Sequence, residues 1–174
     1  MTKFYLQYAL WFLLLIPAQA IVFNHAILFN VAVPLVFIYL IISLPVTVGT
    51  NLSVFFGFLA GFLLDVFCDT PGVNALSCTV LAFVRKPVLH LYVQIDDDLA
   101  GRSPSSHSMM QSVYLKYMIT MVLIYCTMVF IVEAFSFFSF KLLLLRIVAS
   151  TIYTFVLLFA LDFVLLRSSS EPRS

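Results

Sequence analysis

Charged residues are scarce in this chain of 174 residues. Only 10% are Asp, Glu, Lys or Arg, whereas 63% are apolar, and the mean hydropathy is +1.12. A soluble domain needs far more polar surface than this, and a disordered chain combines low hydrophobicity with high charge. The net charge of +1 provides no basic field to hold nucleic acid. The composition therefore excludes disorder, argues against a soluble enzyme and indicates an integral membrane protein.

Residues that carry chemistry are also few and scattered. Metal and redox motifs need cysteines at close, regular spacings, which the three cysteines lack, and we predict free thiols at Cys68, Cys78 and Cys126. The histidines lie far apart in the sequence, at His25, His90 and His107. No nucleophile elbow, phosphate-binding loop or zinc-protease motif occurs. We therefore predict no catalytic, cofactor-binding or metal site, and a protein that is not an enzyme.

The apolar residues form long continuous runs, such as 13–16 and 142–145. Barrel strands alternate apolar and polar residues, so unbroken runs favour helices. The predicted fold class is an all-α integral membrane bundle of six transmembrane helices in one domain, 1–174. Polar residues divide it into helices at about 4–23, 31–44, 52–68, 73–93, 112–132 and 142–166. The range 31–44 is short for a span of about 20 residues, so a re-entrant or strongly tilted segment stays an alternative.

The positions of Lys and Arg predict the orientation. With six spans and a cytoplasmic N-terminus, seven basic residues lie inside and two, Lys141 and Arg146, lie outside, as the positive-inside rule favours. Both termini are then cytoplasmic. The first range also has features of a signal peptide, including Ala18-Gln19-Ala20. Because its apolar run continues to Phe23, we expect a retained helix.

A few charged residues fall inside the predicted helices, where an unpaired charge is costly. By depth, Asp65 matches Arg146 near the outer side, and Arg85 matches Asp162 near the cytoplasmic side. We predict two ion pairs that lock helix packing; the alternative is a path for protons or substrate. Asp69 lies four residues after Asp65 and shares its helical face.

Small residues mark a close helix contact in the range 52–68. Gly57 and Gly61 have the spacing that lets two helix backbones approach, with a helix of this chain or of a partner. A turn with Pro71 and Gly72 follows. Further along, Asp96-Asp97-Asp98 falls in the polar stretch 94–111, where we expect a solvated loop rather than a cation site.

Residues 57–76, GFLAGFLLDVFCDTPGVNAL, resemble the signature of MreD, a bacterial rod-shape-determining membrane protein family. The shared features are a glycine, an aliphatic run, an aspartate, a short turn and a following Ala-Leu. In size and helix count the resemblance covers roughly residues 5–166. The chain departs from the family in its acidic stretch 94–111, and in Cys68 and Asp69, where small residues are common.

The resemblance implies a non-enzymatic scaffold of the cell-wall elongation complex in the bacterial inner membrane, without a cofactor. Its partners would be an MreC-like bitopic protein and, indirectly, MreB, RodA and a penicillin-binding transpeptidase, with membrane lipid around it. The implied fold resembles the substrate-binding subunits of energy-coupling-factor transporters. We expect partner docking or helix packing near Gly57, Gly61, Asp65, Asp69, Pro71 and Gly72.

Two other classes stay open. A vitamin-type substrate-binding subunit of a transporter has the same size, and should line a cavity near the outer side with polar residues. The only hints of such a lining are Trp11, Asn74, Ser77 and Thr79. A membrane enzyme acting on lipid-linked intermediates would need an unpaired acid or a His-Asp set, and none is evident.

Overall fold

The computed structural model describes residues 12, 14–23, 32–70, 72–92, 111–133 and 140–169. The elements in chain order are η1 (Gln19–Phe23), η2 (Val36–Ile38), α2 (Tyr39–Ile42), α3 (Thr50–Cys68), α4 (Val73–Tyr92), α5 (Gln111–Glu133) and α6 (Phe140–Ser169). The four long helices begin and end within three residues of the predicted ranges. Trp11, Pro71, the triplet at 96–98 and most of the first predicted helix lie outside the described residues.

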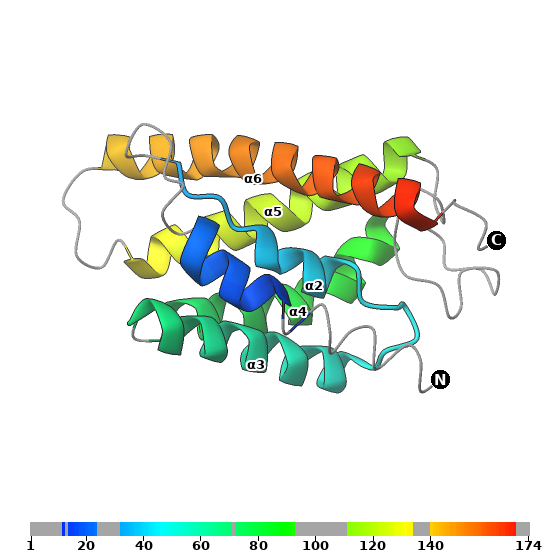
Figure 1. The fold of residues 1–174 in the computed structure, drawn as a ribbon, viewed down its shortest axis with the longest axis horizontal. Helices are drawn as coiled ribbons and strands as arrows, with labels where there is room; N and C mark the ends of the chain where they lie inside the picture. Colours follow the sequence, from blue (N-terminus) through cyan, green and yellow to red (C-terminus); the bar gives the residue numbers. More distant parts are fainter. Residues whose placement is uncertain are drawn as a thin grey trace.

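The long helices pack in chain order, α3 against α4, α4 against α5 and α5 against α6. As a result α3 and α6 lie on opposite sides of the molecule, and α2 lies between them (Figure 1). At one end, α3 and α5 finish while α4 and α6 begin; we call it the Asp69 end. At the opposite end, α4 finishes and the turn from α2 leads into α3; we call it the His90 end.

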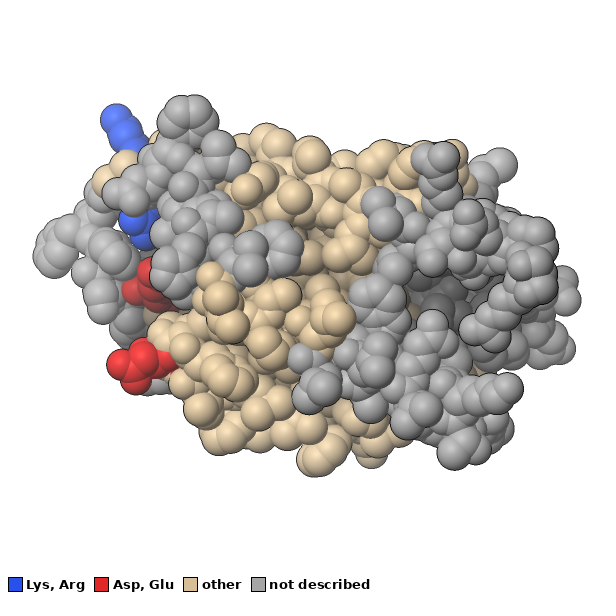
Figure 2. Space-filling view, in the orientation of Figure 1, with Lys and Arg blue, Asp and Glu red and all other residues tan. Residues whose placement is uncertain are grey.

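Three of the described helices are long and apolar enough to cross a membrane: α3, α5 and residues Lys141–Phe163 of α6. Helix α4 has 20 residues, but Arg85, Lys86 and His90 make it more polar. On the face that Figure 2 shows, the charged side chains gather at the Asp69 end, and the described surface in the middle is uncharged. Long apolar helices with a charge-free middle belong to a membrane protein.

The range 31–44 does not form the single helix expected from its apolar run. Residues 33–35 are non-helical, and the chain then forms the 3₁₀ turn η2 and the four-residue helix α2. Two prolines explain this. Pro34 has no N–H to donate and disfavours a helical conformation at Val33, and Pro45 stops the helix at the other side. Because residues 34–42 are all buried, this segment runs through the interior of the bundle.

The described part of the first predicted helix, 4–23, is helical over 14–18 and ends in the π-helical turn η1. Leu15 and Ile16 pack into the core that the other helices form, whereas Leu14 is exposed. A π-helical turn inserted in an α-helix is frequent at functional positions. Here it contains Gln19, whose buried amide has a structural role described below.

Candidate functional site

The carboxylate of Asp65 caps the beginning of the next helix. Asp65 lies on α3, is 5% exposed, and accepts hydrogen bonds from the backbone N–H groups of Asn74 (3.0 Å) and Ala75 (2.8 Å). The side-chain amide of Asn74 (2.9 Å) and the hydroxyl of Thr70 also donate to it. The first N–H groups of a helix lack partners within the helix, and a carboxylate there also interacts favourably with the helix dipole. Asp65 therefore stabilises α4 from a neighbouring helix.

The same cluster extends to α5. The buried hydroxyl of Tyr125 donates to the amide oxygen of Asn74 at 2.8 Å, and the amide nitrogen of Asn74 also reaches the Thr70 hydroxyl at 3.3 Å. The polar atoms of Asp65 and Asn74 thus have partners within the chain. A satisfied network of this kind fixes the packing of α3, α4 and α5.

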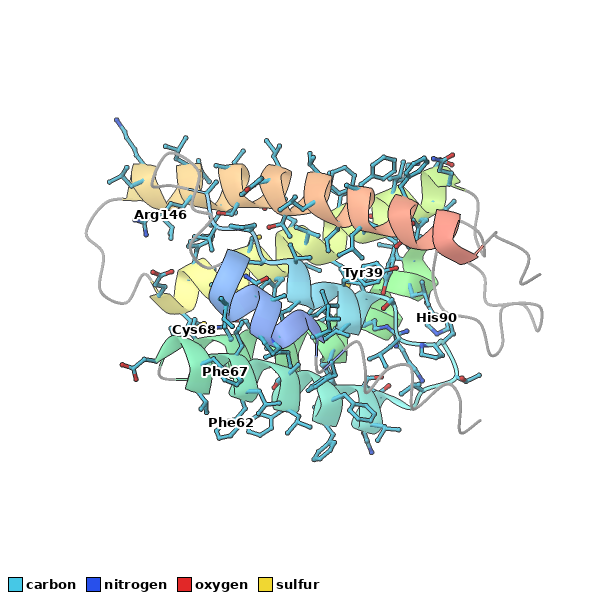
Figure 3. All side chains as sticks on the ribbon, in the orientation of Figure 1. Tyr39, Phe62, Phe67, Cys68, His90 and Arg146 are labelled. Atoms are coloured by element: carbon cyan, nitrogen blue, oxygen red, sulfur yellow. The ribbon has the colours of Figure 1, made fainter. Side chains whose placement is uncertain are left out.

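The predicted partner of Asp65, Arg146, lies elsewhere. Arg146 is near the Asp69 end of α6, at the end where Cys68 closes α3, but on the far side of the bundle (Figure 3). Asp65 and Arg146 thus lie toward the same end of the molecule, but the helices pack in the order α3, α4, α5, α6, so α4 and α5 lie between them. The described hydrogen bonds of Asp65 go to α4 and the turn before it, so the carboxylate is satisfied without Arg146.

The turn after α3 has a defined backbone geometry. Asp69 adopts a left-handed conformation with φ of 54°, and its N–H bonds the carbonyl of Asp65, as in many helix C-caps. Thr70 bonds the same carbonyl at 3.1 Å. Gly72 has φ of 76°, which suits a residue without Cβ. The exposed Asp69 side chain is thus presented at this end of the molecule.

The glycines of α3 make a contact within the chain. A Cβ atom at Gly61 would lie 2.4 Å from the carbonyl oxygen of Asn74, and one at Gly57 would lie 2.8 Å from Ala82 Cβ and from the carbonyl oxygen of Cys78. Both glycines are buried against α4. Of the two readings of this spacing, the structure shows packing between helices of the same chain.

A second buried polar cluster lies at the His90 end. Asp162 of α6, 3% exposed, accepts hydrogen bonds from the hydroxyls of Tyr39 (3.1 Å) and Tyr114 (3.3 Å). These residues come from α6, α2 and α5, which are far apart in the sequence. No spacing in the sequence signals this contact, because each residue is a lone polar group in an apolar run.

Arg85, predicted to pair with Asp162, has other partners. Its side chain is fully buried, and Nη2 donates to the carbonyl oxygens of Leu44 and of Pro45 (3.1 Å). Its Nε and Nη1 atoms have no hydrogen-bond partner among the described residues. The guanidinium therefore bonds the turn that follows α2 and is only partly satisfied.

Three side chains satisfy the backbone of the non-helical segment. Gln19 accepts hydrogen bonds from the N–H groups of Val36 (2.8 Å) and Phe37 (3.3 Å), and its amide nitrogen donates to the Pro34 carbonyl (2.6 Å). From α6, two hydroxyls accept the remaining N–H groups at 3.1 Å, with Ser150 bonding Val33 and Thr154 bonding Leu35. Non-helical backbone at membrane depth is tolerated where protein groups satisfy it.

The described residues that the sequence offered for catalysis or ligand binding have structural roles. The cysteines at 68, 78 and 126 are free thiols, as predicted. The hydroxyls of Ser77 and Thr79 bond carbonyls of their own helix at 2.7 Å. Within the described ranges, no three metal-ligating side chains lie together.

No known protein family, curated protein or solved structure matches this chain. Fold and site therefore define its class: a helical membrane protein whose described interior polar groups largely bond one another or the backbone.

Proposed function

We propose that this chain is a non-enzymatic scaffold, a six-span bundle of the bacterial inner membrane that binds other membrane proteins through its helix faces. The proposal rests on one observation: polar side chains are buried inside the bundle, and apolar side chains cover its outer helix faces. Most buried polar groups at both ends bond within the chain, and the exposed side chains of α3 over 52–67 and of α6 over 142–163 are apolar. A protein of this construction acts through contacts between helices in the bilayer.

The resemblance to MreD gives the proposal its partners. Residues 57–76 form the end of α3, the Asp69 turn and the start of α4, where Asp65 holds the helix pair together. We propose an MreC-like bitopic protein as direct partner, with MreB, RodA and a transpeptidase in the same complex, and cytoplasmic termini.

The outward face of α3 is the proposed docking surface. With the glycines packed against α4, this face presents Phe55, Phe58, Phe62 and Phe67, each 47–61% exposed. The rings of Phe58 and Phe62 stack with centroids 5.9 Å apart, and Phe62 points away from the other helices (Figure 3). Aromatic side chains supply much of the contact energy at protein interfaces, which makes α3 a better candidate than the largely aliphatic outward face of α6.

Site-specific photocrosslinking in membranes tests this function. A photoreactive residue at Phe58 or Phe62 should crosslink to the single helix of the bitopic partner. Val148 and Ile152 are equally exposed positions on α6 and should give lipid adducts only, while buried Leu64 should give no intermolecular product. Crosslinks to the partner from α6 alone would overturn the docking surface, and none from any face would overturn the scaffold.

The transporter alternative has a different expected outcome. A substrate-binding subunit should release a bound metabolite when the purified protein is denatured, and mass spectrometry detects it. The Asp65–Asn74–Tyr125 cluster lies where such a substrate would bind, but its hydrogen bonds are made within the chain. Because these polar groups already bond one another, they favour the scaffold over the transporter subunit.

A further inference from the structure

We infer that the proposed docking surface on α3 takes a transmembrane helix of a different protein in one orientation. A basic residue of that helix lies beside Asp69, and an acidic residue lies beside Lys86. The inference rests on the proposed scaffold function, since it assumes that a partner helix covers this face. It adds the charges that the partner carries and the end of the face at which each charge lies.

The first observation is a continuous exposed stripe along α3. Its residues follow one another at intervals of three or four positions, which places them on one helical face. They are Asn51, Phe55, Phe58, Phe62, Val66 and Asp69. The four residues in the middle are apolar and the two ends are polar, so the stripe has the layout of a surface that crosses a bilayer. Asp69 is its charged end point.

Lys86 of α4 supplies the opposite charge at the other end of the stripe. Gly57 of α3 contacts Ala82 of α4 closely, and the two helices run in opposite directions. Lys86 lies one turn beyond Ala82 on the same face of α4, so it lies beside the first turn of α3, where Asn51 is. Lys86 is half-buried. Its apolar stem can cover the helix surface while the ammonium group reaches the edge of the bilayer.

Neither charge is used within the described part of the chain. The side chains of Asp69 and Lys86 have no hydrogen bond or ion pair there, whereas the buried carboxylates of Asp65 and Asp162 accept hydrogen bonds from other helices. Complementary charges across a helix contact select the partner and fix its orientation. A helix that is basic at the Asp69 end and acidic at the Lys86 end complements both.

The same two charges argue against a second copy of this chain as the occupant. Copies of one membrane protein share one orientation in the bilayer. A symmetric dimer through this face would therefore place Asp69 beside Asp69 and Lys86 beside Lys86. Like charges in contact oppose association, so a different helix fits this face better.

A probe helix of known charge tests the inference. The probe is a synthetic single-span peptide with a Leu/Ala core, lysines at one end and glutamates at the other. It is reconstituted with the purified chain in phosphatidylcholine vesicles, where it inserts in both directions. A photoreactive residue at Phe62, near Asp69, should attach to the lysine half, and one at Phe55, near Lys86, should attach to the glutamate half. We expect a preference of about threefold or more, measured by mass spectrometry of the crosslinked peptides.

Neutral variants assign this preference to the two charges. D69N and K86Q should each reduce the ratio of the two products, and the double variant should bring it to about one. Both should fold, because neither side chain has a described partner to lose. The matched controls are E133Q and K141Q, which remove exposed charges of α5 and α6 and should leave the ratio unchanged.

The possible outcomes separate this inference from the scaffold proposal. Equal attachment of both halves, or a preference that survives in the double variant, overturns the inference and leaves α3 as a docking surface. Lipid adducts alone, or crosslinks between two copies of the chain alone, also overturn it. The scaffold proposal is judged separately, by the crosslinks to the bitopic partner.

Discussion

At Gly61 the backbones of α3 and α4 come so close that a single methyl group has no room. The atoms that its Cβ would meet are backbone atoms of Asn74 and Ala75, at 2.4–2.6 Å, and backbone cannot rotate away as a side chain does. Gly57 is less constrained, because one of its neighbours is the Ala82 side chain. Residue 61 therefore sets the separation of the two helices.

We predict that G61A destabilises the protein by about 1–3 kcal/mol, the range of overpacked cores. The measurement is the free energy of unfolding in detergent. G49A is the comparison, since its Cβ meets nothing within 4 Å; alanine is a poorer N-cap residue than glycine, so G49A should cost no more than about 1 kcal/mol and less than G61A. Equal stability of the two variants would contradict the close packing described here.

Asp65 links two helices through one side chain, and we predict that D65N lowers stability by about 1–2 kcal/mol. The amide has nearly the same volume, but it loses the charge and offers N–H where Ala75 or Asn74 also donates. D69N is the control, since Asp69 is exposed and asparagine tolerates its left-handed backbone. Thermal unfolding of both variants checks the prediction, which fails if D69N is the more damaging change.

At the scale of elements, the segment 32–42 differs most from an ordinary span. The backbone of residues 33–37 depends on side chains from η1 and α6, and only the following residues form helical hydrogen bonds of their own. Each of those side chains contributes more to the stability of the fold than its contact area suggests, because removing it leaves a buried N–H without a hydrogen-bond acceptor.

We predict that T154V destabilises the fold by about 1–3 kcal/mol, because valine keeps the volume of threonine and removes the acceptor of the Leu35 N–H. T79V is the control, as the Thr79 hydroxyl bonds a carbonyl of its own helix, which keeps its helical partner after substitution. The free energy of unfolding in detergent should fall in T154V and not in T79V. An equal fall in both variants would show that valine in a helix is destabilising by itself, and that the lost hydrogen-bond acceptor is not the cause.

The sequence predicts the long helices well and the buried segment 31–44 poorly, for physical reasons. Long apolar runs suffice for α3, α5 and α6, since a helix is the structure that satisfies its own backbone in lipid. The segment 31–44 was missed because its partners, such as Gln19 and Thr154, are distant in sequence. Asp65 and Arg146 lie toward the same end of the molecule, but position along a helix does not specify which side of the bundle that helix occupies.

At the scale of the whole molecule, the two ends differ. The Asp69 end exposes Asp69, Glu133 and Lys141, and its buried carboxylate is fully hydrogen-bonded. The His90 end buries a cation that is only partly satisfied, and Lys86 and Lys116 lie on the adjoining turns of α4 and α5. An excess of positive charge belongs on the cytoplasmic side of a membrane, so we predict that the His90 end faces the cytoplasm.

Cysteine labelling in intact cells tests this orientation. In a cysteine-free background that retains stability, T47C at the His90 end and D69C at the Asp69 end are both exposed positions. An impermeant maleimide should label D69C from outside and should reach T47C only after the membrane is permeabilised. Labelling of both from outside would mean that α3 does not cross the bilayer, and the reverse pattern would invert the orientation. Because α3 is the first long helix after the buried segment, a cytoplasmic T47C together with the predicted cytoplasmic N-terminus would mean that residues 1–44 cross the membrane an even number of times.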